Sequence, residues 1–266
     1  MVRAVPLLFV IFGLLGFALL YIPVLVMMAF SFNAGKLSSV WSGFSVKWYG
    51  ALLTNEALLA ALGKSLLIAG VAASLSTIFG ILIATAFVRF GHFRFRLLLS
   101  ALASAPLVIP EVVMGLSMLL LFIGMEQWLG WPTGRGLDTI IIAHATFGMC
   151  FAAVVIQARL RQFDRSLEEA AMDLGARQPY VFFSVTLPLI MPAIISAWLL
   201  TFTLSFDDLV IASFVSGPGS STLPIVIFSK VRLGVTPEIN AIATLMIVII
   251  AIGVIAGTRL MKKHNP

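Results

Sequence analysis

The chain has 266 residues, of which 61% are hydrophobic and 11% are charged, and its mean hydropathy is +1.10. Because a soluble domain carries about a quarter charged residues, these figures exclude a soluble globular chain and a disordered one. The net charge is +6, but the basic residues form no long run, so nucleic acid is not an expected partner. The only cysteine, Cys150, excludes an internal disulfide. The composition predicts an all-α integral membrane protein.

Six apolar stretches are long enough to cross about 30 Å of hydrocarbon, which takes about 20 helical residues. The predicted spans lie near residues 5–30, 65–88, 97–124, 139–158, 189–211 and 239–258. The first is too long for the apolar core of a secretory signal, so we expect a retained anchor. The chain is predicted to be a single transmembrane domain over residues 1–266.

The basic residues predict how the chain is oriented. With the N-terminus inside, the inner connections hold eleven of the seventeen Lys and Arg residues and the outer connections hold six. Because Lys and Arg concentrate on the cytoplasmic side of a membrane, we expect both termini in the cytoplasm.

Motifs for catalysis are missing from the sequence. Gly63-Lys64-Ser65 resembles the end of a phosphate-binding loop, but Leu58 stands where that loop needs glycine. The three histidines are scattered without zinc spacing, and no nucleophile elbow of the G-x-S-x-G type occurs. We therefore expect no enzyme activity, no metal site and no nucleotide site in this chain.

A short helix is predicted between the fourth and fifth spans, over residues 167–174. Ser166 with Glu169 three residues later forms a capping box, and Gly175 fits a C-terminal stop. The helix has an apolar stripe of Leu167, Ala170, Ala171 and Leu174 and an acidic remainder of Glu168, Glu169 and Asp173. From physics alone, the helix lies on the membrane or on its own bundle, or it docks on a cytoplasmic partner.

This loop also carries a family resemblance. Glu169-Ala170-Ala171, followed by Gly175 and then by Leu187-Pro188, resembles the EAA loop of permease subunits in ATP-driven (ABC) importers. The resemblance extends over essentially the whole chain. It implies a six-transmembrane-helix bundle of the type I ABC importer permease class, with residues 167–174 as a cytoplasmic coupling helix. The residues implied in ATPase coupling are Glu169, Ala170, Ala171, Asp173 and Gly175.

Further runs resemble the permeases of polyamine importers, both putrescine-type and spermidine-type. They include Ser31-Phe32-Asn33, Lys47-Trp48-Tyr49 and the run of residues 201–210. The resemblance implies two ATPase subunits, which would bind ATP-Mg, a second related permease and a periplasmic polyamine-binding protein. It also implies a place in the lipid bilayer of a bacterial inner membrane and no cofactor on this chain. The rival interpretation is a stand-alone secondary transporter or channel for organic cations, which would explain buried acids but not the loop helix.

Three carboxylates lie within or at the edge of predicted spans, where charge is costly unless it serves a path or a partner. The predicted substrate pathway consists of Glu111, Asp208, Asp207, Ser205 and Thr201. Thr201, Ser205 and Asp208 recur on one helix face, whereas Asp207 lies on a neighbouring face and is expected to contribute less. The alternative is that the acids cap helices or pair with Lys230 or Arg232.

Two further expectations concern residues near these acids. Pro106 and Pro110 precede Glu111 and should distort the third span, because proline lacks a backbone donor and its ring clashes with the preceding turn. His144 is expected to be a neutral packing residue that forms hydrogen bonds.

Overall fold

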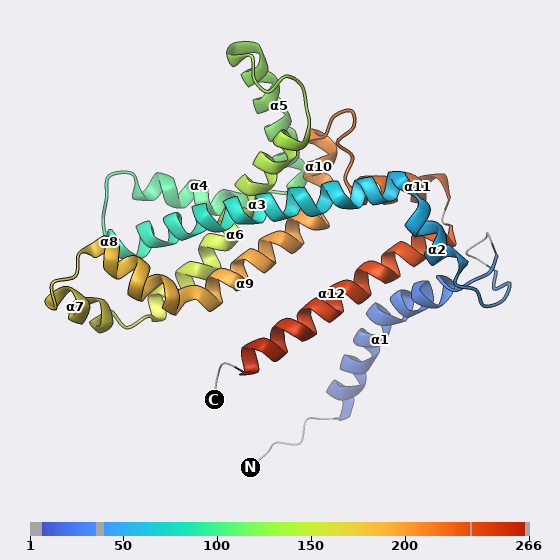
Figure 1. Ribbon diagram of the computed structural model, residues 1–266, viewed down its shortest axis with the longest axis horizontal. Coiled ribbons are helices and arrows are strands. Elements are labelled where there is room, and N and C mark those ends of the chain that lie inside the picture. The colour runs from blue at the N-terminus through green and yellow to red at the C-terminus, as the bar shows by residue number, and fades with distance from the viewer. Residues whose placement is uncertain (1–6, 36–39, 235, 264–266) are drawn as a thin grey trace. The chain divides into compact units, whose positions relative to one another are not determined.

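The computed structural model describes residues 7–35, 40–234 and 236–263. Their regular structure is helical, and one isolated β-bridge joins Asn33 to Phe44. The chain divides into two compact units, the first formed by Met1–Leu59 with Val226–Pro266 and the second by Ala60–Ile225. The helices of both units are labelled in Figure 1.

The first unit contains α1 (Leu7–Phe30), α2 (Lys47–Thr54) and α12 (Pro237–Lys263), and α12 packs against both of the others. The first turn of α12 is tied down through Glu238. Its carboxylate accepts hydrogen bonds from Asn55 Nδ2 at 2.8 Å and from Lys230 Nζ at 3.2 Å. Lys230, one of the two cations considered as partners for the pathway acids, is thus paired within the first unit.

A buried asparagine organises the connection between α1 and α2. Asn33 Oδ1 accepts the backbone N–H of Ser42 at 2.8 Å, and its carbonyl accepts the indole N–H of Trp48 at 2.7 Å. The hydroxyls of Ser31 and Tyr49 lie 2.7 Å apart. Two runs that carry the polyamine-permease resemblance, 31–33 and 47–49, therefore meet in space.

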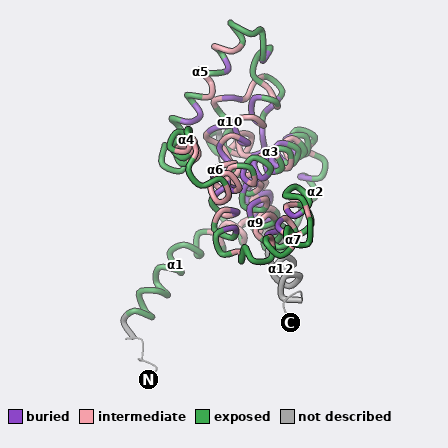
Figure 2. Tube along the Cα trace, turned by 90° about the vertical axis from the view of Figure 1, so that its left-hand side faces the viewer, coloured by how far each residue is buried: buried purple, intermediate pink, exposed green. Residues whose placement is uncertain are grey.

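The second unit is built around α6 (Leu137–Gln162), which contacts α4, α5, α9 and α10. In its most apolar stretch 61% of the residues are buried, whereas none is buried in the corresponding stretch of α1. Figure 2 shows buried positions gathered along α6 and the helices packed against it. The other helices of this unit are α4 (Arg96–Val108), α5 (Glu111–Leu129), α7 (Ser166–Asp173), α8 (Gln178–Val181), the π-helix η1 (Phe182–Thr186), α9 (Leu187–Phe206), α10 (Val210–Val215) and nearly all of α3 (Glu56–Arg89). Helix α11 (Leu223–Leu233) begins in this unit and continues into the first.

Small residues let α3 approach α6 closely. A Cβ atom on Gly80 would lie 2.6 Å from the Cβ of Ala152 and 2.9 Å from the backbone nitrogen of Ala153. Ala84, Ala152 and Ile156 continue this contact in a buried cluster. Because helices in lipid associate through tight packing of small residues, this contact fits a membrane-embedded bundle.

The predicted third span, 97–124, is not one helix in the structure. It divides into α4 and α5, which run in different directions in Figure 1. Ile109 between them is extended, with φ −74° and ψ 132°, and Pro110 precedes the first turn of α5. The residue before a proline is driven out of the helical region, so the predicted distortion is a complete break.

Within the described residues, five helical segments are long and apolar enough to cross a membrane: Phe9–Phe30, Glu56–Arg89, Glu111–Leu129, Leu137–Gln162 and Gln178–Phe206. The apolar helices Arg96–Val108 and Pro237–Ile249 are shorter. The prediction of an all-α integral membrane protein is therefore confirmed, and the exact span boundaries stay a prediction.

Candidate functional site at the two ends of helix α9

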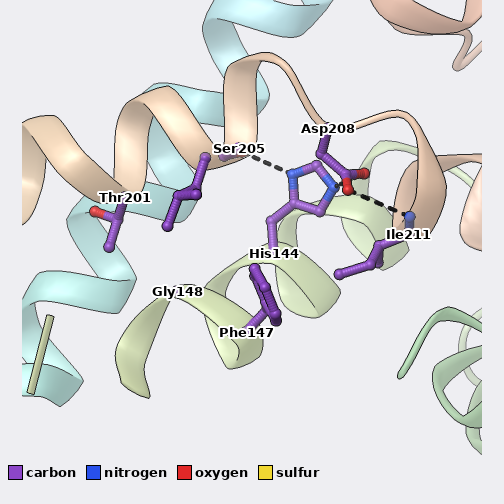
Figure 3. A pocket seen from close by; sticks show the side chains of 8 residues that line it. His144, Phe147, Gly148, Thr201, Ser205, Asp208 and Ile211 are labelled. Atoms are coloured by element: carbon purple, nitrogen blue, oxygen red, sulfur yellow. Dashed lines mark hydrogen bonds and ion pairs between the residues drawn. The ribbon is translucent and has the colours of Figure 1, made fainter. Parts of the chain in front are cut away.

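Asp208 lies just beyond the C-terminal end of α9, where it meets His144 of α6. Nε2 of His144 lies 3.1 Å from Oδ2 of Asp208, and Nδ1 lies 2.7 Å from the hydroxyl of Ser205 (Figure 3). The side chains of His144 and Asp208 are only 2% and 8% exposed. A carboxylate only accepts, so Nε2–H of His144 donates to Asp208, whereas either the ring or the hydroxyl can be the donor between Nδ1 and Ser205. His144 therefore forms hydrogen bonds as expected, and its partners are two predicted pathway residues.

Asp208 also holds the start of α10. Its carboxylate accepts the backbone N–H of Ala212 at 2.7 Å and of Ile211 at 3.3 Å. Unsatisfied N–H groups at a helix start favour such an anion. The predicted fifth span, 189–211, is thus interrupted, because α9 ends at Phe206 and Asp208 caps a separate short helix. Helix capping, one of the alternatives drawn from the sequence, is realised for Asp208.

Thr201 and Ser205 line the same small cavity as His144 and Asp208. The hydroxyl of Thr201 donates to the carbonyl of Ala197 at 2.9 Å, within its own helix. The cavity volume is about 10 Å³, which is at the lower limit for holding one water molecule. In this conformation the four side chains therefore leave no room for an organic cation.

The remaining predicted acids, Glu111 and Asp207, are exposed at the same end of α9. Glu111 is the first residue of α5, and Asp207 caps the C-terminus of α9. The carboxylates of Asp208 and Glu111 both lie close enough to Asp207 to act on it electrostatically. The structure thus brings the three predicted acids together, with Asp208 engaged and the other two presented outward.

Helices α8, η1 and α9 form one helical segment, Gln178–Phe206. Helix α7 lies at the start of this segment, where it contacts α8 and η1. Its left-handed stop is as predicted, since Gly175 has φ +90°. Gly175 N–H donates to Met172 O at 2.9 Å, and Ala176 N–H donates to Ala171 O at 3.1 Å. This pair of bonds is a Schellman motif, which glycine favours because it has no Cβ.

The predicted capping box is wrong. Helix α7 begins at Ser166 itself, and no side chain caps it from the N-cap position. The N–H of Ser166 instead donates to Asp164 Oδ1 at 3.0 Å, and this hydrogen bond lowers the pKa of Asp164. The Ser166 hydroxyl therefore lies inside the first turn, where it cannot serve as an N-cap.

Three of the four residues in the apolar stripe of α7 face away from the chain's own core. Leu167, Ala170 and Leu174 are exposed, Leu174 to 91%, whereas Glu168 and Ala171 are half-buried. A helix resting its stripe on its own bundle would bury these positions. The exposure therefore favours docking on another surface over packing within the subunit.

Comparison with known families decides the class of this chain. The family described as "Binding-protein-dependent transport system inner membrane component" matches residues 76–266, a range that includes α7 and the three acids. The chain belongs to this family. It is therefore a permease component of the inner membrane, and the interpretation as a stand-alone transporter or channel is set aside.

Similar sequences cover most of this permease. The putrescine transport system permease protein PotI of Escherichia coli (strain K12) is 57% identical over 234 residues, which cover 88% of this chain and 83% of PotI. The spermidine/putrescine transport system permease protein PotC of Haemophilus influenzae is 41% identical over 249 residues, 94% of each chain. The predicted resemblance to polyamine importer permeases is confirmed.

Solved structures share the fold of the permease. A chain of a bacterial ABC transporter involved in the import of the acidic polysaccharide alginate superposes with a TM-score of 0.73 at 17% identity, covering 97% of this chain and 96% of that chain. A chain of the MetNI methionine ABC transporter gives a TM-score of 0.61 at 18% identity, covering 79% and 96%. At these identities the likeness shows the fold, which confirms the predicted importer-permease class.

Sequence reasoning missed several residues that the structure brings into these sites. The sequence placed Glu168 in the acidic remainder of the helix without a role, yet it contacts Arg89 of α3 and Thr186 of η1. These partners lie 79 and 18 residues away in the sequence. The one available signal was position: adjacent acids on a helix point about 100° apart, so Glu168 and Glu169 cannot share one partner surface.

Proposed function

We propose that this permease is one of two membrane subunits of an ATP-driven importer that carries polyamines, putrescine or spermidine or both, from the periplasm to the cytoplasm by alternating access. The observation that carries the proposal is the 57% identity with the putrescine permease PotI across 88% of the chain. The grouping of Glu111, Asp207 and Asp208 supports it, because a polyamine is a multiple cation.

The proposed assembly contains a second, related permease, two ATPase subunits that bind ATP-Mg and a periplasmic polyamine-binding protein. This chain binds no nucleotide itself and performs no hydrolysis. Both of its termini lie in the cytoplasm, in keeping with the bias of basic residues. Reporters fused after Lys263 and within residues 159–179 should both read cytoplasmic, and a periplasmic reading at either place would overturn this orientation.

Helix α7 is the proposed contact with the ATPase. Glu169, Ala170 and Asp173 are exposed beside the apolar stripe, and Gly175 sets the angle at which the chain leaves the helix. Ala171 is half-buried, so its small side chain keeps α7 close to the permease. ATP-driven closure of the two ATPases would then move α7.

The end of α9 near Asp208 is the proposed amine pathway. Glu111 and Asp207 present exposed carboxylates, which replace part of the hydration that an ammonium group loses when it leaves water. Thr201, Ser205 and Asp208 line the closed cavity beneath them. We propose that the cavity widens in another state of the cycle, and that Asp208 then exchanges a protein partner for an amine.

Uptake into proteoliposomes containing the complete complex tests the proposal. Labelled putrescine and spermidine should be transported only when ATP is present on the side of the membrane that carries the ATPase subunits and the binding protein is present on the opposite side. Unlabelled di- and triamines should compete, whereas lysine, a cation with a carboxylate, should compete weakly. Uptake that persists without the ATPase subunits, or that no amine inhibits, would overturn the proposed function.

A further inference from the structure

Three helical elements meet at the carboxylate of Glu168. Nη2 of Arg89, in the last turn of α3, lies 2.5 Å from Glu168 Oε1. The hydroxyl of Thr186, the last residue of η1, donates to the same oxygen. One atom of α7 therefore accepts from α3 and from the segment that continues into α9.

This joint is shielded from water. The side chains of Arg89 and Glu168 are 17% and 14% exposed. Removing one partner of a shielded ion pair leaves an uncompensated charge, which costs far more than breaking a surface pair. Separating Glu168 from Arg89 is therefore costly in free energy, so a displacement of α7 is transmitted to α3 before the ion pair breaks.

The residues just before α7 reinforce the same connection. Arg165 Nη2 donates to the carbonyl of Val88 at 2.6 Å. The guanidinium of Arg89 lies over the ring of Phe163, 5.6 Å from its centroid. The segment that precedes α7 thus makes two further contacts with the end of α3.

The guanidinium of Arg89 has an unused donor that would allow its hydrogen bonds to rearrange. Nη1 of Arg89 is buried and meets no hydrogen-bond partner among the residues that the structure describes. Such an unpaired donor costs free energy, so the guanidinium gains whenever a shift of α7 offers it a second acceptor. The π-helical turn of η1, which ends at Thr186, lies at the same point, and such turns occur frequently at functional sites.

Helix α3 carries the connection to the other end of the second unit. Lys64 lies 25 residues before Arg89 in one continuous helix, about 38 Å away at 1.5 Å per residue. Its Nζ donates to Gly219 O at 2.6 Å, and the neighbouring Ser65 Oγ accepts the N–H of Leu223 at 2.8 Å. These residues follow α10, which Asp208 caps. A displacement of Arg89 therefore reaches the segment beside the acid cluster through a single rigid element.

We infer that Glu168, held by Arg89 and Thr186, is the positioning residue that transmits movement of α7 to α3 and α9, and so sets how much substrate moves for each ATP hydrolysed. The inference rests on the proposed function, because it presumes that an ATPase moves α7. It assigns the two adjacent acids different tasks: exposed Glu169 faces the partner, and Glu168 joins the helix to its own subunit.

The test is the ratio of substrate imported to ATP hydrolysed, measured per assembled complex in proteoliposomes. Arg89→Gln and Glu168→Gln should each leave binding-protein-stimulated hydrolysis in place but lower this ratio roughly fivefold, within the range by which changes along a contact network alter coupling. Arg94→Gln, an exposed arginine beyond the end of α3, is the matched control and should keep the ratio.

A double-mutant cycle separates a joint from two unrelated defects. If the two residues act together, Arg89→Gln/Glu168→Gln should be no worse than the worse single variant. Losses that multiply, or a ratio that stays normal in both single variants, would overturn the inference. If a charge variant does not assemble, Thr186→Val removes one hydroxyl only and should still lower the ratio, and a normal ratio there would also overturn it.

The wild-type complex keeps this test distinct from the proposed function. Failure of the wild type to import any amine would refute the proposed function, whatever the variants do. Normal import by the wild type together with an unchanged ratio in the variants would refute only the role of the joint.

Discussion

The two ends of the helical segment that includes α9 each hold a shielded carboxylate, but with different partners. Glu168, near its start, pairs with the guanidinium of Arg89 at 2.5 Å. Asp208, beyond its end, is held by the His144 ring at 3.1 Å and by backbone N–H groups of α10. Arginine stays charged at all physiological pH values. A backbone N–H is an uncharged donor, and histidine is a side chain that can lose its charge in this pH range.

This difference indicates which end is built to stay together. A shielded carboxylate facing a permanent cation has no better partner to gain, so the α7 end suits the transmission of force. A shielded carboxylate that faces backbone N–H groups and an imidazole, with no permanent cation, gains when a cation replaces one of these donors. The Asp208 end therefore suits the temporary binding of an amine, and the predictions below test this contrast.

The largest effect is expected at the α7 end from Gly175→Val. A left-handed conformation costs an L-residue about 1–2 kcal/mol, and more for a β-branched one, so the Schellman stop should be lost. Amine-stimulated ATP hydrolysis and uptake should fall to about a tenth or less, since 1.4 kcal/mol is a factor of ten. Gly175→Asn is the matched control, because asparagine tolerates this conformation, and it should retain most activity. Equal activity of the valine and asparagine variants would contradict the role of the turn.

A charge reversal on the outward face of α7 should act on docking alone. Glu169→Lys replaces a negative charge by a positive one in the proposed contact with the ATPase, and a mismatched charge there costs on the order of 1.4 kcal/mol or more. The amount of ATPase that copurifies with the permease should fall about tenfold. With Glu169→Gln the amount of copurified ATPase should fall less, because this substitution removes a charge without reversing it. Normal copurification and transport in Glu169→Lys would rule out the docking role.

At the other end, Glu111→Gln and Asp208→Asn should each slow amine uptake roughly fivefold, which corresponds to about 1 kcal/mol, the net value of one ordinary hydrogen bond. Asp208→Asn should also lower the melting temperature, because Asp208 caps α10, whereas Glu111→Gln should not. Uptake must be measured per assembled complex. Full uptake per complex in both variants would leave these acids structural.

Asp207 provides a check on the sequence-based expectation that it matters least of the three acids. Its exposed carboxylate beside Glu111 leads us to expect that Asp207→Asn slows uptake about as much as Glu111→Gln, roughly threefold to fivefold. Comparing initial uptake rates of these two variants at equal complex levels measures this directly. A normal rate in Asp207→Asn would restore the original ranking.

The smallest effect is expected from Thr201→Val. Its hydroxyl is buried and bonded to the carbonyl of Ala197, which already accepts a helical hydrogen bond. Uptake should therefore change by less than about twofold. A larger loss in initial-rate measurements, without loss of protein, would mean that the hydroxyl turns toward the substrate in another state.

The sequence predicted most of the fold because its strongest signals are local. Apolar length located the helices, and the left-handed turn at Gly175 followed from a single residue type. The break between α4 and α5 was underestimated, since Pro110 and its neighbour act together on one peptide. The start of α7 was misplaced because the side chain that accepts a backbone N–H there belongs to Asp164 and not to Ser166. Aspartate and serine are both favoured at helix starts, so the sequence alone does not distinguish them.

The candidate site was only partly predictable because its decisive contacts are long-range. The acids were found, since carboxylates in apolar stretches are conspicuous. Their partners were not, because His144 reaches Asp208 across 64 residues and Arg89 reaches Glu168 across 79. A single sequence contains no pairing information for such distances, so Glu168 could not be told from its neighbour Glu169 by chemistry.

The most direct test of the contrast between the two ends is substrate selectivity, measured as the ratio of spermidine to putrescine uptake with one binding protein throughout. Glu111→Gln should lower this ratio, because a triamine carries one more positive charge than a diamine and loses more when a carboxylate is removed. Glu168→Gln should slow both substrates by the same factor and leave the ratio unchanged. A selectivity change in Glu168→Gln, or none in Glu111→Gln despite slower uptake, would contradict the assignment of amine handling and ATP coupling to opposite ends.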